Sequence, residues 1–147
     1  MREKVPILCG IVGPSGSGKT YSSLSVATGF QRVYGGDVFV VDTESKRALH
    51  YADLFKFRHV PFDPPFSPAD YLSVLEHCVK RGARTIVVDS GSHLHEGPGG
   101  ILEMHAAEVE RLKGVMGGVG AANFPAWQKP KSELRRLINE ILRLGVN

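Results

Sequence analysis

Apolar runs and amphipathic stretches alternate along the first part of the chain. Residues 5–12 (VPILCGIV) are almost continuously apolar, which is typical of a central strand buried on both faces of a parallel sheet. Residues 37–42 (DVFVVD) and 85–89 (TIVVD) are also strand-like, because both are rich in β-branched side chains, and both end in an aspartate. Residues 57–61 indicate a weaker strand. The pattern therefore predicts a sheet built from these segments.

The intervals between the predicted strands show the spacing of amphipathic helices. Residues 19–30 and 67–81 predict helices, and residues 45–55 predict a shorter one. Strands that alternate with helices favour an α/β fold, in which a parallel sheet carries helices on both faces. Ligands of such sheets bind at the carboxyl ends of the strands, so we expect the residues at these ends to form one pocket.

The pattern changes after residue 89. Residues 101–113 predict a helix, whereas residues 114–131 contain many glycines without periodicity and predict a long mobile loop. Ser132 is typical of the N-cap of a last amphipathic helix. The sequence stops at Asn147, where the next parallel strand of such a sheet would begin. We therefore expect residues 1–147 to form a single domain that is the N-terminal part of a longer core.

The composition is ordinary for a globular domain. The 147 residues carry a formal net charge of +3, with 42% apolar and 22% charged residues. No stretch has the form of a signal peptide or a transmembrane helix, so we expect a cytoplasmic protein without a membrane partner. Cys9 and Cys78 form no C-x-x-C motif and predict two buried thiols rather than a disulfide or a metal site. The mild basicity permits contact with nucleic acid without requiring it.

Residues 13–20 (GPSGSGKT) carry the most specific signal. They match the phosphate-binding loop G-x-x-x-x-G-K-[ST] at every fixed position, between a predicted strand and a predicted helix. Glycines let successive backbone N–H groups turn toward a polyphosphate, and the following helix adds its positive N-terminal dipole. Lys19 would reach the β- and γ-phosphates, and the Thr20 hydroxyl would bind Mg²⁺. The residues expected to bind the nucleotide are Gly13, Pro14, Ser15, Gly16, Ser17, Gly18, Lys19, Thr20 and Tyr21.

Two carboxylates follow predicted strands and are candidates for the chemistry. Asp89 ends an apolar strand, and in phosphate-loop enzymes the aspartate at this place holds Mg²⁺ through water, close to the threonine that Thr20 matches here. Many such enzymes place a catalytic glutamate directly after this aspartate, but Ser90 occupies that position here. Glu44, two residues beyond the second strand, is the other candidate to orient and polarise an attacking water. The plainer alternatives are that Asp89 caps a turn and that Glu44 is an exposed loop acid.

These residues resemble a known family. Residues 42–44 (DTE), followed by Ala48 and Leu49, together with residues 87–90 (VVDS), look like the RecA family of recombination ATPases. With the loop sequence they are most similar to small phage-encoded relatives, the mini-RecA single-strand annealing proteins. Motifs carry the resemblance over residues 7–89, and the rest of the chain follows by pattern only.

The resemblance implies a RecA-like core that binds ATP and Mg²⁺ and hydrolyses ATP. It assigns Glu44 as the catalytic base, Asp89 as the Mg²⁺ aspartate, and Lys19 and Thr20 as the loop pair. It also implies coupling to the binding, annealing or recombination of single-stranded DNA in a homo-oligomer. Two departures weaken the match: the polar γ-phosphate sensor of RecA-type cores lies on a strand beyond this chain, and no DNA-binding loop motif is recognisable.

Other classes of protein make different demands on the sequence. A small-molecule kinase predicts a lid with several arginines, whereas residues 91–131 contain only Arg111. A GTP-dependent switch needs an N-K-x-D motif, which the chain lacks, and partition ATPases carry an early loop lysine where this chain has Pro14. The glycine spacing excludes a Rossmann dinucleotide fold. A DNA-packaging or helicase-like motor stays open, because it uses the same core.

Three further groups of residues have a functional and a plainer interpretation. Aromatic and basic side chains between residues 124 and 131 could stack bases and meet phosphates, or could pack and be solvated. His93 and His95, beside Glu96, could ligate a metal, although loop histidines are more often polar surface. Lys46 and Arg47 could reach a neighbouring subunit's nucleotide or simply be solvent-exposed. The members of the aromatic and basic group are Phe124, Trp127, Lys129 and Lys131.

Overall fold

The computed structural model describes residues 5–146, which form two compact units. Residues 63–73 and 91–141 make up one of them, called here the helical unit. The rest of the described chain makes up the other, called here the sheet unit. Each unit has its own cluster of buried apolar side chains.

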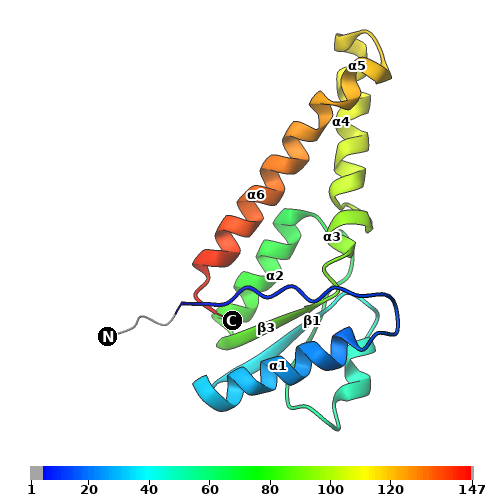
Figure 1. The fold of residues 1–147 in the computed structure, drawn as a ribbon. Coiled ribbons are helices and arrows are strands. Elements are labelled where there is room, and N and C mark those ends of the chain that lie inside the picture. Colours follow the sequence, from blue (N-terminus) through cyan, green and yellow to red (C-terminus); the bar gives the residue numbers. More distant parts are fainter. Residues whose placement is uncertain (1–4, 147) are drawn as a thin grey trace. The chain divides into compact units, whose positions relative to one another are not determined.

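The sheet unit is built on three parallel strands in the order β2-β1-β3 (Figure 1). β1 (Asp37–Asp42) lies in the centre, between β2 (Arg58–Pro61) and β3 (Ala83–Asp89). The register pairs Asp42 with Asp89, so the carboxyl ends of the two longer strands finish level. The predicted α/β class with a parallel sheet is confirmed at this level.

Helices flank this sheet, and their buried faces form the core with the strands. α1 (Lys19–Tyr34) packs against β1 and β3, and the 3₁₀ helix η1 (Arg47–Tyr51) follows β1. α2 (Pro68–Lys80) precedes β3 in the chain. These three elements correspond to the helices expected from the apolar spacing. The central core cluster consists of Leu24, Ala27, Val38, Val40, Ala48 and Val87.

Residues 5–12 correct one of the sequence predictions. They form no strand and run outside the sheet, and they are the dark blue segment that leads into the turn before α1 in Figure 1. Val5, Leu8 and Val12 are 77%, 61% and 97% exposed. The central position is taken by β1, whose two edges are already paired with β2 and β3. An apolar run is a buried strand only where a sheet edge and covering helices receive it, and here neither does.

The helical unit corrects a second prediction, because residues 114–131 are mostly helical rather than a mobile loop. Gly117 and Gly118, both with positive φ (79° and 132°), separate two helices, and Ala122 and Ala126 beyond them are buried. The last helix begins at Gln128, so Ser132 is not its N-cap. The helices are α3 (His93–Glu96), α4 (Ile101–Met116), α5 (Val119–Asn123), the 3₁₀ turn η2 (Pro125–Trp127) and α6 (Gln128–Arg143).

A small core explains why this segment is ordered. Val109 of α4 packs with Ala122 and Ala126, and Leu112 packs against this cluster. Ala has the highest helix propensity, so the alanines favour helix on both sides of Phe124 once the glycine turn is made. Within residues 5–146, no helix is long and apolar enough to cross a membrane.

The two cysteines are free thiols in different environments. Cys78 in α2 is fully buried, as predicted, and burial raises the pKa of its thiol. Cys9 is exposed, so the prediction of a buried thiol is wrong there. The reason is that Cys9 belongs to the segment that stays outside the sheet.

Candidate functional site

The loop before α1 has the backbone form that its glycines predict. Gly16 and Gly18 adopt left-handed conformations (φ 76° and 82°), which side chains with a Cβ rarely accept. Gly18 is the N-cap of α1, and no side chain of the described residues caps this helix end. The first turn of the 16-residue helix also contains no acidic residue. Its N–H groups and positive dipole end are therefore left for an anion.

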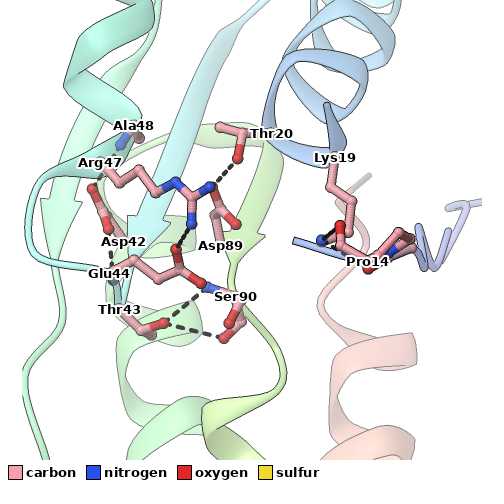
Figure 2. Close-up of polar contacts among 11 residues, drawn as sticks. Pro14, Lys19, Thr20, Asp42, Thr43, Glu44, Arg47, Ala48, Asp89 and Ser90 are labelled. Carbon is pink, nitrogen blue, oxygen red and sulfur yellow. Dashed lines mark hydrogen bonds and ion pairs between the residues drawn. The ribbon is translucent and has the colours of Figure 1, made fainter. Parts of the chain in front are cut away.

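Lys19 folds back over this loop. Its Nζ donates hydrogen bonds to the backbone oxygens of Gly13 and Pro14, both at 2.8 Å (Figure 2). The two carbonyls hold the ammonium at the loop rather than in solvent. A phosphate that enters the loop would therefore meet a positive charge that is already in place.

Thr20 connects the loop to the end of β3. Its Oγ1 donates a 2.7 Å hydrogen bond to Oδ2 of Asp89, across 69 positions of sequence. The hydroxyl arrives there because Thr20 continues the buried stripe of α1, four and seven positions before Leu24 and Ala27. The expected convergence of the loop and the strand end is thus present for these two side chains.

The paired oxygens of Thr20 and Asp89 suit a hard cation. The Thr20 hydroxyl and an Asp89 carboxylate oxygen lie 2.7 Å apart, and both are hard oxygen donors that could hold Mg²⁺, directly or through a bound water. Within residues 5–146, no group of three or more His, Cys, Asp or Glu side chains could hold a metal by itself. This donor set fits an ion that takes its remaining ligands from water and phosphate, as Mg²⁺ usually does.

Asp42 organises the loop that follows β1, a role that the sequence reasoning missed. Its side chain is 1% exposed and accepts hydrogen bonds from the backbone N–H of Glu44 at 2.8 Å and of Ala48 at 3.1 Å. His59 Nε2 lies 2.9 Å from the same carboxylate. The available signal was an aspartate at a strand end, since Asp side chains commonly bond backbone N–H groups a few residues on.

A second set of contacts joins the ends of β1 and β3. The N–H of Thr43 donates to the backbone oxygen of Asp89 at 2.8 Å. The N–H of Ser90 donates to Thr43 Oγ1 at 2.8 Å, and this hydroxyl lies 3.2 Å from the Ser90 oxygen. The residues flanking Asp89 and Glu44 are therefore tied together (Figure 2).

Glu44 lies on this loop and pairs with Arg47, a contact that the sequence reasoning did not anticipate. Arg47 Nη1 donates to Glu44 Oε2, and the two side chains are 49% and 25% exposed. The hydrogen bond and charge of Glu44 raise the pKa of the Arg47 guanidinium, and the charge of Asp89 adds to this. The two residues are three positions apart, but Ser45 and Lys46 between them are left-handed, so the i, i+3 rule for helices does not predict this pair.

Tyr21 and the aromatic candidates have other neighbours in the structure. Tyr21 makes edge contacts with the rings of Tyr51 and Phe55, at centroid distances of 6.2 and 5.2 Å. It is 51% exposed, and its contact with a nucleotide stays a prediction. In the helical unit, Trp127 stacks on His105 with the ring centroids 4.0 Å apart.

The remaining candidates of the helical unit are partly engaged. Lys129 bonds the buried Glu108 at 2.9 Å, which Arg111 also contacts, and both cations lower the pKa of that carboxyl. Phe124 is 84% exposed. His93 stacks on Phe66 at a centroid distance of 5.0 Å. These contacts give Lys129, Trp127 and His93 structural roles, while the nucleic-acid role of Lys129 and Trp127 and the metal role of His93 stay predictions.

Comparisons of the chain with protein-family models, with curated proteins and with solved structures gave no match. The case for a function therefore depends on the motif and on the geometry around it. That geometry brings a phosphate-binding loop sequence, a hydroxyl–carboxylate pair and a second carboxylate to the strand ends of one unit.

Proposed function

We propose that this chain binds MgATP at residues 13–20 and hydrolyses it. The observation that carries the proposal is the hydrogen bond between Thr20 and Asp89. The motif predicted a Mg²⁺ hydroxyl at one position and the strand pattern predicted a Mg²⁺ aspartate 69 positions away. A chance glycine-rich turn would have no reason to deliver its threonine to that particular carboxylate.

Each of the proposed roles follows from a side chain's place in the sheet unit. The N–H groups of the loop and of the first turn of α1 bind the phosphates, and Lys19 neutralises their charge. Thr20 and Asp89 hold Mg²⁺, which when bound supplies a Lewis acid at the phosphate oxygens. Glu44, on the loop after the neighbouring strand, orients and deprotonates the attacking water.

The coupling of this activity to single-stranded DNA in a homo-oligomer is the part of the proposal that depends on the resemblance to the RecA family. It is supported by residues 42–44 and 87–90, which supply the two carboxylates. Residues 114–131 lend it no separate support, because they are mostly helical. The effect of DNA on ATP hydrolysis is therefore tested separately from nucleotide binding.

The first experiment measures binding and turnover in the same preparations. Fluorescent ATP is titrated with Mg²⁺ or with EDTA, and phosphate release is followed with no DNA, with single-stranded DNA and with duplex DNA. Lys19→Ala should lose nucleotide binding, and Glu44→Gln should keep binding and lose turnover. Lys113→Ala, which removes an exposed ammonium of the helical unit, is the matched control and should behave as wild type.

The outcomes separate the readings of the site. No detectable binding of ATP by the wild-type protein would refute the proposal. Normal hydrolysis by Glu44→Gln would remove Glu44 as the base but would leave the nucleotide site. Stimulation by duplex DNA alone would favour a packaging or helicase-like motor over a RecA-type protein. Phosphate transfer to a small molecule would indicate a kinase.

A further inference from the structure

The carboxylates at the strand ends of the sheet unit are not neutralised by Lys19, the lysine of the phosphate loop. Lys19 is bonded to two backbone carbonyls, so its ammonium is not paired with a carboxylate. Asp42 is occupied by backbone N–H groups and by His59. Of the two other carboxylates, Glu44 is paired with Arg47, and Asp89 accepts the hydrogen bond of Thr20.

The backbone position of Arg47 is set by the loop that follows β1. The Asp42 carboxylate accepts hydrogen bonds from the N–H groups of Glu44 and Ala48, which lie at the two ends of the loop of residues 44–48. Between them Ser45 and Lys46 adopt left-handed conformations (φ 54° and 72°). Such conformations are unfavourable for residues with a Cβ and persist only where surrounding contacts impose them.

The direction of Arg47 follows from this loop. Figure 2 shows its guanidinium reaching back from the start of η1 over Glu44, on the side where Asp89 and Thr20 lie. The charge of Asp89 also acts on the guanidinium. A cation that is paired with Glu44 therefore lies on the side where Thr20 and Asp89 are proposed to hold Mg²⁺.

We propose that Arg47 is the internal counter-ion of Glu44 in the nucleotide-free protein, and that its charge, held on the side of Thr20 and Asp89, opposes the binding of a divalent cation by those two residues. The inference rests on the proposed function, because it assumes that Asp89 and Thr20 take a metal. Its consequence is that the metal binds against a resident charge. With a divalent cation at Thr20 and Asp89, Arg47 would be repelled by like charge, and Glu44 would lose its ion pair and be able to accept a hydrogen bond from water.

The test compares Mn²⁺ binding, measured by electron paramagnetic resonance without nucleotide, in the wild type and in Arg47→Gln. Gln has a similar reach and no charge, so the substitution removes the opposing charge and keeps much of the side-chain volume. An exposed ion pair contributes up to about 1 kcal/mol, so the Mn²⁺ dissociation constant should fall about fivefold. Arg47→Lys keeps the charge and should stay within about twofold of wild type.

The matched control is Arg58→Gln. Arg58 makes a comparable exposed ion pair with Asp37, which lies at the opposite end of β1. It changes the net charge by the same amount away from the site, so it should leave the Mn²⁺ dissociation constant unchanged. An equal gain in Arg47→Gln and Arg58→Gln would show a general charge effect and would overturn the inference, as would an unchanged or weaker Mn²⁺ affinity in Arg47→Gln.

A second measurement keeps this inference distinguishable from the proposed function. Fluorescent ADP in EDTA reports on the phosphate loop without a metal, and its affinity should be the same in wild type and Arg47→Gln. If ADP binds and the Mn²⁺ affinities do not differ, the counter-ion role of Arg47 is wrong and the nucleotide site stands. If neither ADP nor Mn²⁺ binds to any of the proteins, both the inference and the proposed function are wrong.

Discussion

Removal of the Asp42 carboxylate should destabilise the sheet unit far more than an ordinary strand substitution. In Asp42→Ala the N–H groups of Glu44 and Ala48 and the ring nitrogen of His59 lose their acceptor. Ala48 is fully buried, so water does not readily replace the lost partner. Hydrogen bonds to a charged group contribute about 1.5–3 kcal/mol each, and part of the three is regained by rearrangement. We expect the free energy of unfolding to fall by about 3–5 kcal/mol.

The same strand supplies the control for this experiment. Asp37 begins β1 as Asp42 ends it, but its side chain is 42% exposed and makes only a surface pair with Arg58. Asp37→Ala should therefore cost about 0–1 kcal/mol. Urea denaturation followed by circular dichroism gives both values under identical conditions. A difference of less than about 1 kcal/mol between the two variants would refute the idea that Asp42 holds the loop after β1.

Two further predictions concern single residues. Lys46→Gly should raise the free energy of unfolding by about 0.5–1 kcal/mol, because glycine accepts the left-handed conformation of this position (φ 72°) without steric cost. Lys46→Ala keeps the Cβ, so it should give no such gain in the same urea experiment. Burial raises the pKa of Tyr71 from 10.0 to about 12, so the unfolded chain ionises first and stability should fall as the pH rises from about 10 to about 12. Absorbance titration of tyrosinate should show a component near pH 12 that is absent in Tyr71→Phe, and a titration identical to wild type in that variant would contradict the assignment.

The sequence predicted the elements whose evidence is local. Residues 37–42 and 85–89 are rich in β-branched side chains, and they are β1 and most of β3. Residues 5–12 look at least as strand-like, yet they stay unpaired, although the order β2-β1-β3 leaves the outer edge of β3 without a neighbouring strand among the described residues. Apolar character shows a preference for burial and does not determine strand pairing. The error over residues 114–131 has the opposite cause. The many glycines of this segment suggest a loop, but only Gly117 and Gly118 have positive φ and interrupt the helices. Gly114 and Gly120 lie within α4 and α5.

The candidate site divides in the same way. Lys19 and Thr20 could be placed from the motif, because the spacing of the glycines and of the helix start that follows them is itself local. The contacts of Asp42 could not, since they depend on which backbone N–H groups the chain brings back to the strand end. The pairing of Arg47 with Glu44 needed the left-handed pair at Ser45 and Lys46, which no propensity favours.

The two corrected segments bear on how the phosphate loop is held. With residues 5–12 outside the sheet, no strand in front of the loop fixes it within the described structure. The loop is instead positioned by α1, the helix that follows it. The buried residues Thr20, Leu24 and Ala27 of α1 pack toward the strands. Because Thr20 is the first of these residues, the packing that stabilises the core also brings its hydroxyl to Asp89. The packing of α1 against the strands thus also determines where the proposed Mg²⁺ ligands lie. A substitution that shifts α1 relative to the sheet is therefore expected to change both the free energy of unfolding and the affinity for the metal.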